Sequence, residues 1–107
     1  EGARAVSSTA LGLAACEKPE RYIQQLVSHW GHKFATSYDE GDGMGLFPFS
    51  EHTNCVMTAH EHGIAITLTT ADLDENVRMR GGIEKHIDRF AFREAPLTYT
   101  WNEAKDS

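Results

Sequence analysis

Basic side chains gather at two places in this sequence, and their types are those that bind anions or metals. The candidate ligand-binding residues are His29, His32 and Lys33 in the first third of the chain and His86, Arg89 and Arg93 near its end. Lysine and arginine donate charge-assisted hydrogen bonds to carboxylates and phosphates. An imidazole does the same when protonated and ligates metals when neutral. No residue is assigned a catalytic role.

Both groups fall on predicted helices. Pro19 suits a first helical position, and apolar residues then recur at spacings of three and four up to Trp30, which predicts a helix that ends near Gly31. Asp72 is the expected cap of a second helix that runs to about Ala91. We place all three basic residues of the second group along one stripe of this helix. If the helices pack side by side, the two basic flanks form one polar seam.

Two interpretations of this seam involve no metal. In the first, the basic side chains only stabilise the fold, near helix ends and through pairs with Asp88, Glu94 or Asp39. In the second, they bind a small anion such as a carboxylate or a phosphate. Arginine offers two parallel donors to such groups, and a local positive cluster attracts an anion to an otherwise acidic protein.

A third interpretation is a metal site. His29, His32 and His86 could supply three imidazoles to zinc or iron(II) and leave a coordination position open. The positive charge of Lys33, Arg89 and Arg93 beside them opposes a dication. We therefore prefer the anion to the metal, and all three interpretations stay open at this point.

Other patterns carry less chemistry. His60 and His62 flank the tip of a tight predicted hairpin, where solvated histidines are common. Glycines at positions 41, 43 and 45 resemble a phosphate-binding loop, but neither the lysine nor the helix that such a loop requires follows them. We interpret this segment as a flexible hairpin.

The remaining elements are strands. A two-residue period predicts strands at residues 7–13, 34–38, 44–49, 55–60, 64–69 and 97–101. In the second helix Glu75 gives Asp72 a capping-box-like partner. Gly81 and Gly82 fall in the middle of that helix, where we expect a bend or a close contact, because each glycine costs about 1 kcal/mol relative to alanine.

The order of elements is β-α-β-β-β-β-α-β, which indicates an α+β fold. We expect a two-layer sandwich in which one antiparallel sheet carries both helices on one face. The other face mixes threonine, alanine and histidine. Such a pattern suits either solvent or a homodimer surface.

Length and composition set the remaining bounds. The 107 residues predict a single domain, with residues 1–6 as a flexible leader. A net charge of −6 repels phosphate backbones, so no nucleic acid is expected as a partner. No apolar run is long enough to span a bilayer, and we expect a cytoplasmic protein without a membrane partner. Cys16 and Cys55 are too few for a disulfide scaffold and are interpreted as small apolar side chains.

Two motifs, R-Y-x-x-x-L-x-x-H-W-x-H-K-F at residues 21–34 and H-x-x-R-F-A-F-R-E at residues 86–94, are followed by Tyr99-x-Trp101. Together they resemble the bacterial family named domain of unknown function 2218, over nearly the whole chain from about Thr9 to Asn102. The resemblance implies a TBP-like sandwich and no known activity. Members of that family occur joined to or beside siderophore-interacting flavoproteins, which implies an iron-uptake flavoprotein as a partner. The stretch between residues 13 and 19 and the turn at residues 60–62 depart from the family pattern.

These observations predict a small cytoplasmic binding or accessory module rather than a catalyst. Its histidine, lysine and arginine cluster suits a small anionic ligand or a partner protein, and no cofactor is identified. The alternative is a zinc- or iron-binding auxiliary protein, or an enzyme, in iron or siderophore handling.

Overall fold

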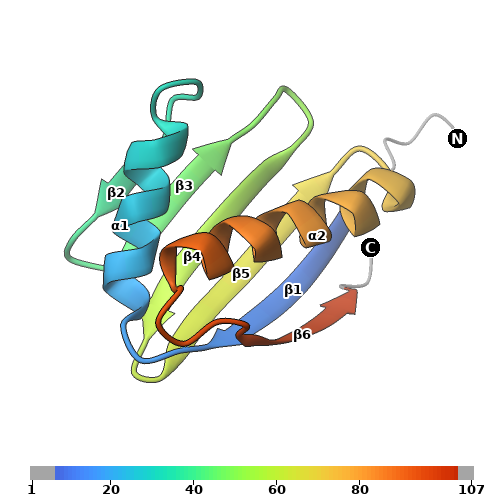
Figure 1. Ribbon diagram of the computed structural model, residues 1–107. Coiled ribbons are helices and arrows are strands. Elements are labelled where there is room, and N and C mark those ends of the chain that lie inside the picture. Colours follow the sequence, from blue (N-terminus) through green and yellow to red (C-terminus); the bar gives the residue numbers. More distant parts are fainter. Residues whose placement is uncertain (1–6, 104–107) are drawn as a thin grey trace, which may run out of the picture.

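Six strands form one antiparallel sheet, and two helices lie over one of its faces (Figure 1). The computed structural model describes residues 7–103, so the leader predicted for residues 1–6 lies outside the described residues. The strands are β1 (Ser8–Ala15), β2 (Ser37–Asp39), β3 (Met44–Pro48), β4 (Asn54–His60), β5 (Gly63–Thr70) and β6 (Thr98–Glu103). The helices are α1 (Pro19–Trp30) and α2 (Leu73–Phe90). This is the α+β sandwich that the sequence predicts.

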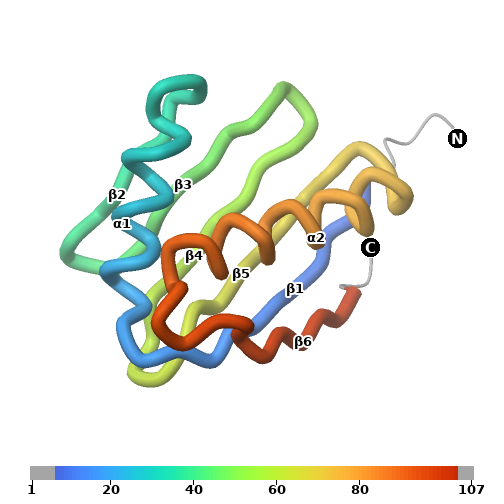
Figure 2. The backbone as a smooth tube through the Cα atoms, viewed as in Figure 1, coloured from blue at the N-terminus to red at the C-terminus, as the bar shows by residue number. Residues whose placement is uncertain are grey.

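The strands lie in the order β2-β3-β4-β5-β1-β6, and every neighbouring pair is antiparallel. The trace in Figure 2 shows α2 running across the sheet toward α1 and ending beside it. Elements follow one another along the chain as predicted, and most of their ends agree with the prediction within two residues. The TBP-like character implied by the family resemblance stays a prediction.

The core lies between the helices and the sheet. It is built from Ile64, Ile66 and Leu68 of β5, Ile23 and Leu26 of α1, and Ile83 and Ile87 of α2, each at most 1% exposed. Burying one such side chain contributes about 1.5–3 kcal/mol. Cys16 and Cys55 are buried free thiols, as predicted, and burial raises the pKa of Cys16 to about 11.

β1 turns its small residues toward the helices and its leucines away from them. Ala10, Gly12 and Ala14 are buried, whereas Leu11 and Leu13 are exposed on the opposite face of the sheet. A Cβ at Gly12 would lie 2.7 Å from the indole ring of Trp101 on the neighbouring strand. The glycine therefore makes the room that this large ring needs.

Polar side chains one turn apart on α2 hold β6 in place. The indole N–H of Trp101 donates to Glu84 at 2.7 Å, and the hydroxyl of Tyr99 donates to Asp88 at 2.8 Å. One turn earlier, Arg80 lies 3.5 Å from Glu103. The spacings match, because four helical residues rise about 6 Å and two strand residues about 6.6 Å. Burial, and then the bond to Asp88, raises the pKa of Tyr99.

The strand predicted at residues 34–38 is mostly absent, and β2 is only three residues long. The backbone N–H groups of Lys33 and Phe34 donate to the carbonyl of Trp30, at 3.0 and 2.8 Å. The hydroxyl of Thr36 donates to the carbonyl of Val27 at 2.8 Å. Carbonyls at the end of α1 thus find partners in the following segment, which winds back over the helix end instead of extending.

α2 differs from prediction in two details. Asp72 caps the helix by accepting the N–H of Glu75 at 2.8 Å, as predicted, but the Glu75 carboxylate accepts the hydroxyl of Thr53 instead of returning to the cap. The close contact expected at Gly81 and Gly82 is also wrong. A Cβ at either position would meet no atom within 4 Å, and the helix runs through both without interruption.

We expect Gly12→Ala and Gly81→Ala to change stability in opposite directions. At Gly12 the added methyl group overlaps the ring of Trp101, which costs about 1–3 kcal/mol. At Gly81 it meets open space and lowers the conformational entropy lost on folding, which gains about 0.5–1 kcal/mol. Urea unfolding followed by circular dichroism measures both changes. A destabilised Gly81→Ala variant would contradict the open surface described for this turn.

Candidate functional site

A pocket of about 600 Å³ lies where the end of α1 faces the middle of α2, and we call it the interhelical pocket. Its apolar lining comes from Trp30, Phe34, Phe49, Met79 and Ile83. Its basic lining comes from His29, His32, Lys33 and His86. Four of the six residues predicted to bind a ligand thus share one cavity.

Aromatic rings form one wall of the interhelical pocket. The Trp30 ring centre lies 5.0 Å from that of Phe49 with an angle of 81° between the planes, and Phe34 meets Phe49 at 5.1 Å and 86°. Trp30 also meets the buried ring of Phe47 at 5.4 Å. These edge-to-face contacts hold each other's orientation. The pocket therefore presents fixed ring surfaces to whatever enters it.

Gly82 forms the part of the wall that belongs to α2. Because it has no side chain, the pocket reaches the helix there, and a Cβ would meet no atom within 4 Å. Gly81, one residue earlier, does not line the pocket. The glycine that was expected to bend the helix instead leaves space beside it.

Two imidazoles stand at the junction of the helices. The ring centres of His29 and His86 lie 5.5 Å apart, and the ring of Trp30 lies 4.7 Å from that of His86. Nδ1 of His86 is 2.8 Å from the carbonyl oxygen of Gly82. Since a carbonyl only accepts, Nδ1 carries the proton of this bond. Nε2 of neutral His86 is then an acceptor, and it becomes a donor when the ring is protonated.

The pocket is electrostatically positive. The pKa of His29 lies below its usual value of 6.5, first because of burial and then because of the neighbouring charges of His86, Arg89 and His32. These groups disfavour a further proton on His29. Burial, the larger cause, disfavours a charge of either sign in this place, and the smaller contribution of the neighbouring basic groups favours a negative one.

The acidic partners expected for these basic residues bind elsewhere. Asp88 accepts the hydroxyl of Tyr99, Glu94 accepts the hydroxyl of Tyr22 at 2.7 Å, and Asp39 accepts backbone N–H groups of its own turn. The ion pairs found within residues 7–103 involve none of the basic residues of the interhelical pocket. The purely structural interpretation predicted such pairs, which are missing there, and also basic side chains near helix ends, where His29 and Arg89 do lie in the last turns of α1 and α2.

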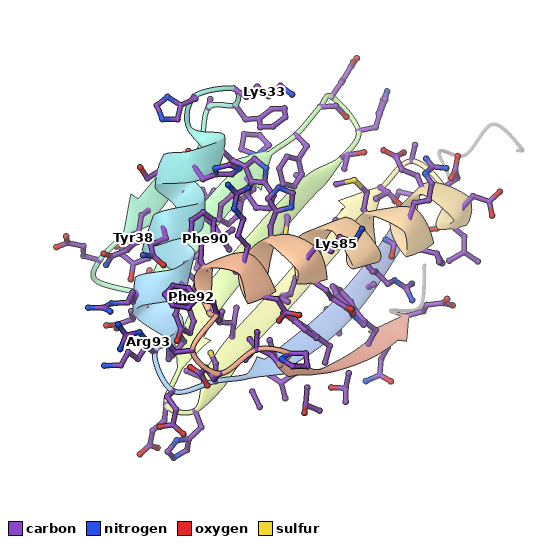
Figure 3. All side chains as sticks on the ribbon, in the orientation of Figure 1. Lys33, Tyr38, Lys85, Phe90, Phe92 and Arg93 are labelled. Atoms are coloured by element: carbon purple, nitrogen blue, oxygen red, sulfur yellow. The ribbon has the colours of Figure 1, made fainter. Side chains whose placement is uncertain are left out.

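The other two predicted residues lie outside the interhelical pocket. The prediction that Arg93 continues the stripe of His86 is wrong, because α2 ends at Phe90 and the chain then turns. Arg93 lines a separate groove beside the first turns of α1, and Figure 3 shows it near the opposite end of α1 from Lys33. Arg89 is exposed, with its guanidinium 5.9 Å from the ring of Phe90, and reaches the site only through its charge on His29.

The three imidazoles do not form a metal site in this structure. Among residues 7–103, no group of three histidine, cysteine, aspartate or glutamate side chains has the geometry to hold a metal ion. His29 and His86 face each other, but His32 follows the end of α1 and is exposed. The convergence that the metal interpretation requires is therefore missing.

Sequence reasoning missed the apolar half of the site. Residue type and spacing did not single out Trp30, Phe34, Phe49 or Met79 as ligand contacts, and Trp30 also packs against the core. One signal could have found the site: a glycine in an exposed turn of a helix costs stability and needs a reason. At Gly82 the reason is that a side chain would occupy part of the interhelical pocket.

Comparison with known proteins agrees with this fold. A family model described as an uncharacterized protein conserved in bacteria (DUF2218) matches residues 12–102. The chain belongs to this family. Its matched range includes both sequence motifs and all the lining residues of the interhelical pocket.

A solved member of the same fold supports the architecture of this DUF2218 chain. The NMR structure of PA4090 from Pseudomonas aeruginosa is 26% identical, with a TM-score of 0.73. The alignment covers 89% of this chain and 95% of that one. No curated protein matches the chain.

Replacing His86 by glutamine should raise the pKa of His29 toward 6.5, because one of the charges that oppose its protonation is removed. NMR titration of the His29 ring protons measures this. Without the substitution, His29 binds a proton at higher pH in the unfolded chain than in the folded protein, because folding lowers its pKa. The free energy of unfolding therefore falls as the pH falls below 6.5. His60→Gln, at the far end of β4, is the control and should leave the titration of His29 unchanged. An unchanged His29 pKa in His86→Gln would show that the two rings do not interact.

Proposed function

We propose that this chain binds a small organic anion with an aromatic or other planar apolar body, and that the interhelical pocket is its binding site. The observation that carries the proposal is the pairing, in one cavity, of a wall of fixed aromatic rings with basic side chains that no carboxylate among residues 7–103 neutralises. The rings suit a flat apolar body, and the basic side suits a carboxylate or a similar group.

Size and lining support an organic ligand over an inorganic ion. Small-molecule sites usually measure about 300–1,000 Å³ and combine a mostly apolar lining with a few polar groups. The interhelical pocket, at about 600 Å³, falls in that range. A bare phosphate or chloride would leave the faces of Trp30, Phe34 and Phe49 in contact with water. An aromatic acid would cover them and place its charge by His29, Lys33 or His86.

Cellular location and protein partner do not follow from this pocket. Within the described range, neither helix has the length and apolar character needed to cross a membrane. A cytoplasmic location and a siderophore-interacting flavoprotein as partner stay predictions. The interhelical pocket would suit an accessory module that holds such an acid for another protein.

A larger side chain at position 82 of α2 should fill part of the pocket and weaken ligand binding. We expect Gly82→Leu to reduce the affinity for naphthalene-1-carboxylate at least tenfold, because the new side chain enters the space that the ligand needs. Gly81→Leu is the matched control, since it makes the same change one residue away and outside the lining. Calorimetric titration measures affinity, and the Trp30 indole signal in NMR spectra reports the location. Equal affinities of the two variants would rule out this pocket as the site.

The negative charge of the ligand should contribute to binding. We expect naphthalene-1-carboxylate to bind at least tenfold more tightly than its neutral carboxamide, as a charge-assisted hydrogen bond is worth about 1.5–3 kcal/mol. Its affinity should rise as the pH falls below 6.5, because the pKa of His29 lies below that value and a protonated imidazole binds an anion best. His29→Gln should flatten this dependence, and His60→Gln should preserve it. Equal affinities for the acid and the amide would contradict the proposal that the pocket selects an anion.

A further inference from the structure

The face of the sheet opposite the helices has an apolar centre. Strand register aligns its residues in rows across β3, β4, β5 and β1. One row holds Leu46, Val56, Thr67 and Leu11. The next row holds Met44, Thr58, Ala65 and Leu13. We call these two rows the open-face patch.

The leucines of the open-face patch are about half exposed. Leu11 is 48% exposed, Leu13 52% and Leu46 42%, although each lies within a regular strand. Scattered single leucines are normal on a protein surface, whereas here each row holds three apolar residues and one threonine, and apolar surface gathered in this way indicates an interface. The rows are four strands wide and lie in the middle of the sheet, not at an edge.

The rim of this face is polar but almost without charge. Threonine, serine and asparagine surround the patch, for example Thr9, Asn54 and Asn102. Among the described strand residues that face this side, Asp39 on the short β2 is the only aspartate, glutamate, lysine or arginine. In the whole sequence these four residue types make up 24%. An apolar centre within a polar rim is the usual anatomy of a protein interface. With no lysine or arginine among those residues, the face cannot hold a phosphate backbone.

We propose that this face binds a second copy of the chain, so that two sheets stack face to face about a two-fold axis. Two chains of net charge −6 repel each other except where their surfaces are uncharged, and this face meets that condition. A two-fold axis places the open-face patch against itself. A different partner selected by charge would find no charges here to recognise.

The area is sufficient for such a pair. Six strands spaced about 4.8 Å apart span about 29 Å, and six residues of strand span about 20 Å, so each copy offers roughly 600 Å². The pair then buries about 1,200 Å², the lower bound of stable, specific interfaces. Stacked sheets lie about 10 Å apart with side chains that interdigitate, as leucine and threonine can. In this arrangement both helical layers face outward, and both interhelical pockets stay accessible.

Sedimentation velocity of the full chain at about 100 μM tests the proposal. The native chain should sediment as a dimer. Thr67→Lys, which adds a charge at the centre of the open-face patch, should sediment as a monomer with an unchanged circular dichroism spectrum. Gln24→Lys adds the same charge on the exposed side of α1 and is the matched control that should stay dimeric.

A second variant keeps the test decisive if Thr67→Lys fails to fold. Leu13→Thr preserves the preference for a strand and removes an apolar contact, so the dimer dissociation constant should rise at least tenfold. A monomeric native chain overturns the proposal. So does a dimer that survives Thr67→Lys, or a dissociation constant that Leu13→Thr leaves unchanged, because that dimer would form through another surface.

Discussion

The contacts between α2 and β6 determine how α2 is rotated about its own axis, and much of the structure depends on that rotation. Glu84 and Asp88 face the edge strand, where they hold Trp101 and Tyr99. The helix period then directs Ile83 and Ile87 into the core and leaves Gly82 and His86 toward α1. One side of α2 thus fastens the sheet, a second fills the core and a third lines the interhelical pocket.

Acidic and basic side chains have different roles in this arrangement. Carboxylates near the helices serve as hydrogen-bond acceptors within the fold, as Asp88 does for Tyr99 and Glu94 for Tyr22. Within the part of the chain that the structure describes, the basic residues at the junction of the helices receive no such partner. A chain that is acidic as a whole therefore has a locally positive cavity. This arrangement favours an external anion over an internal salt bridge as the partner of His86 and Lys33.

Periodicity and turn chemistry in the sequence were enough to predict most of the strands, both helices and the cap at Asp72, because these depend on neighbours in the chain. The errors arose where contacts beyond the local sequence pattern determine where an element begins or ends. β2 is short because the end of α1 binds the next segment, and Arg93 leaves its predicted stripe because α2 stops at Phe90. Four site residues were found from their charge. The aromatic wall was missed, since spacing cannot distinguish a ring that is buried from one that borders a cavity.

The glycine pair of α2 has a consequence for motion. Each glycine weakens a helix by about 1 kcal/mol, and neither is compensated here by packing. The turn beside the interhelical pocket is thus less stable than the same turn would be with alanine in place of glycine. Local opening follows a low free energy, so amide hydrogens of this turn exchange with solvent sooner than they would in an alanine-containing helix. The pocket is bordered by a stretch of α2 whose low helix propensity makes it easier to admit a molecule wider than the resting space.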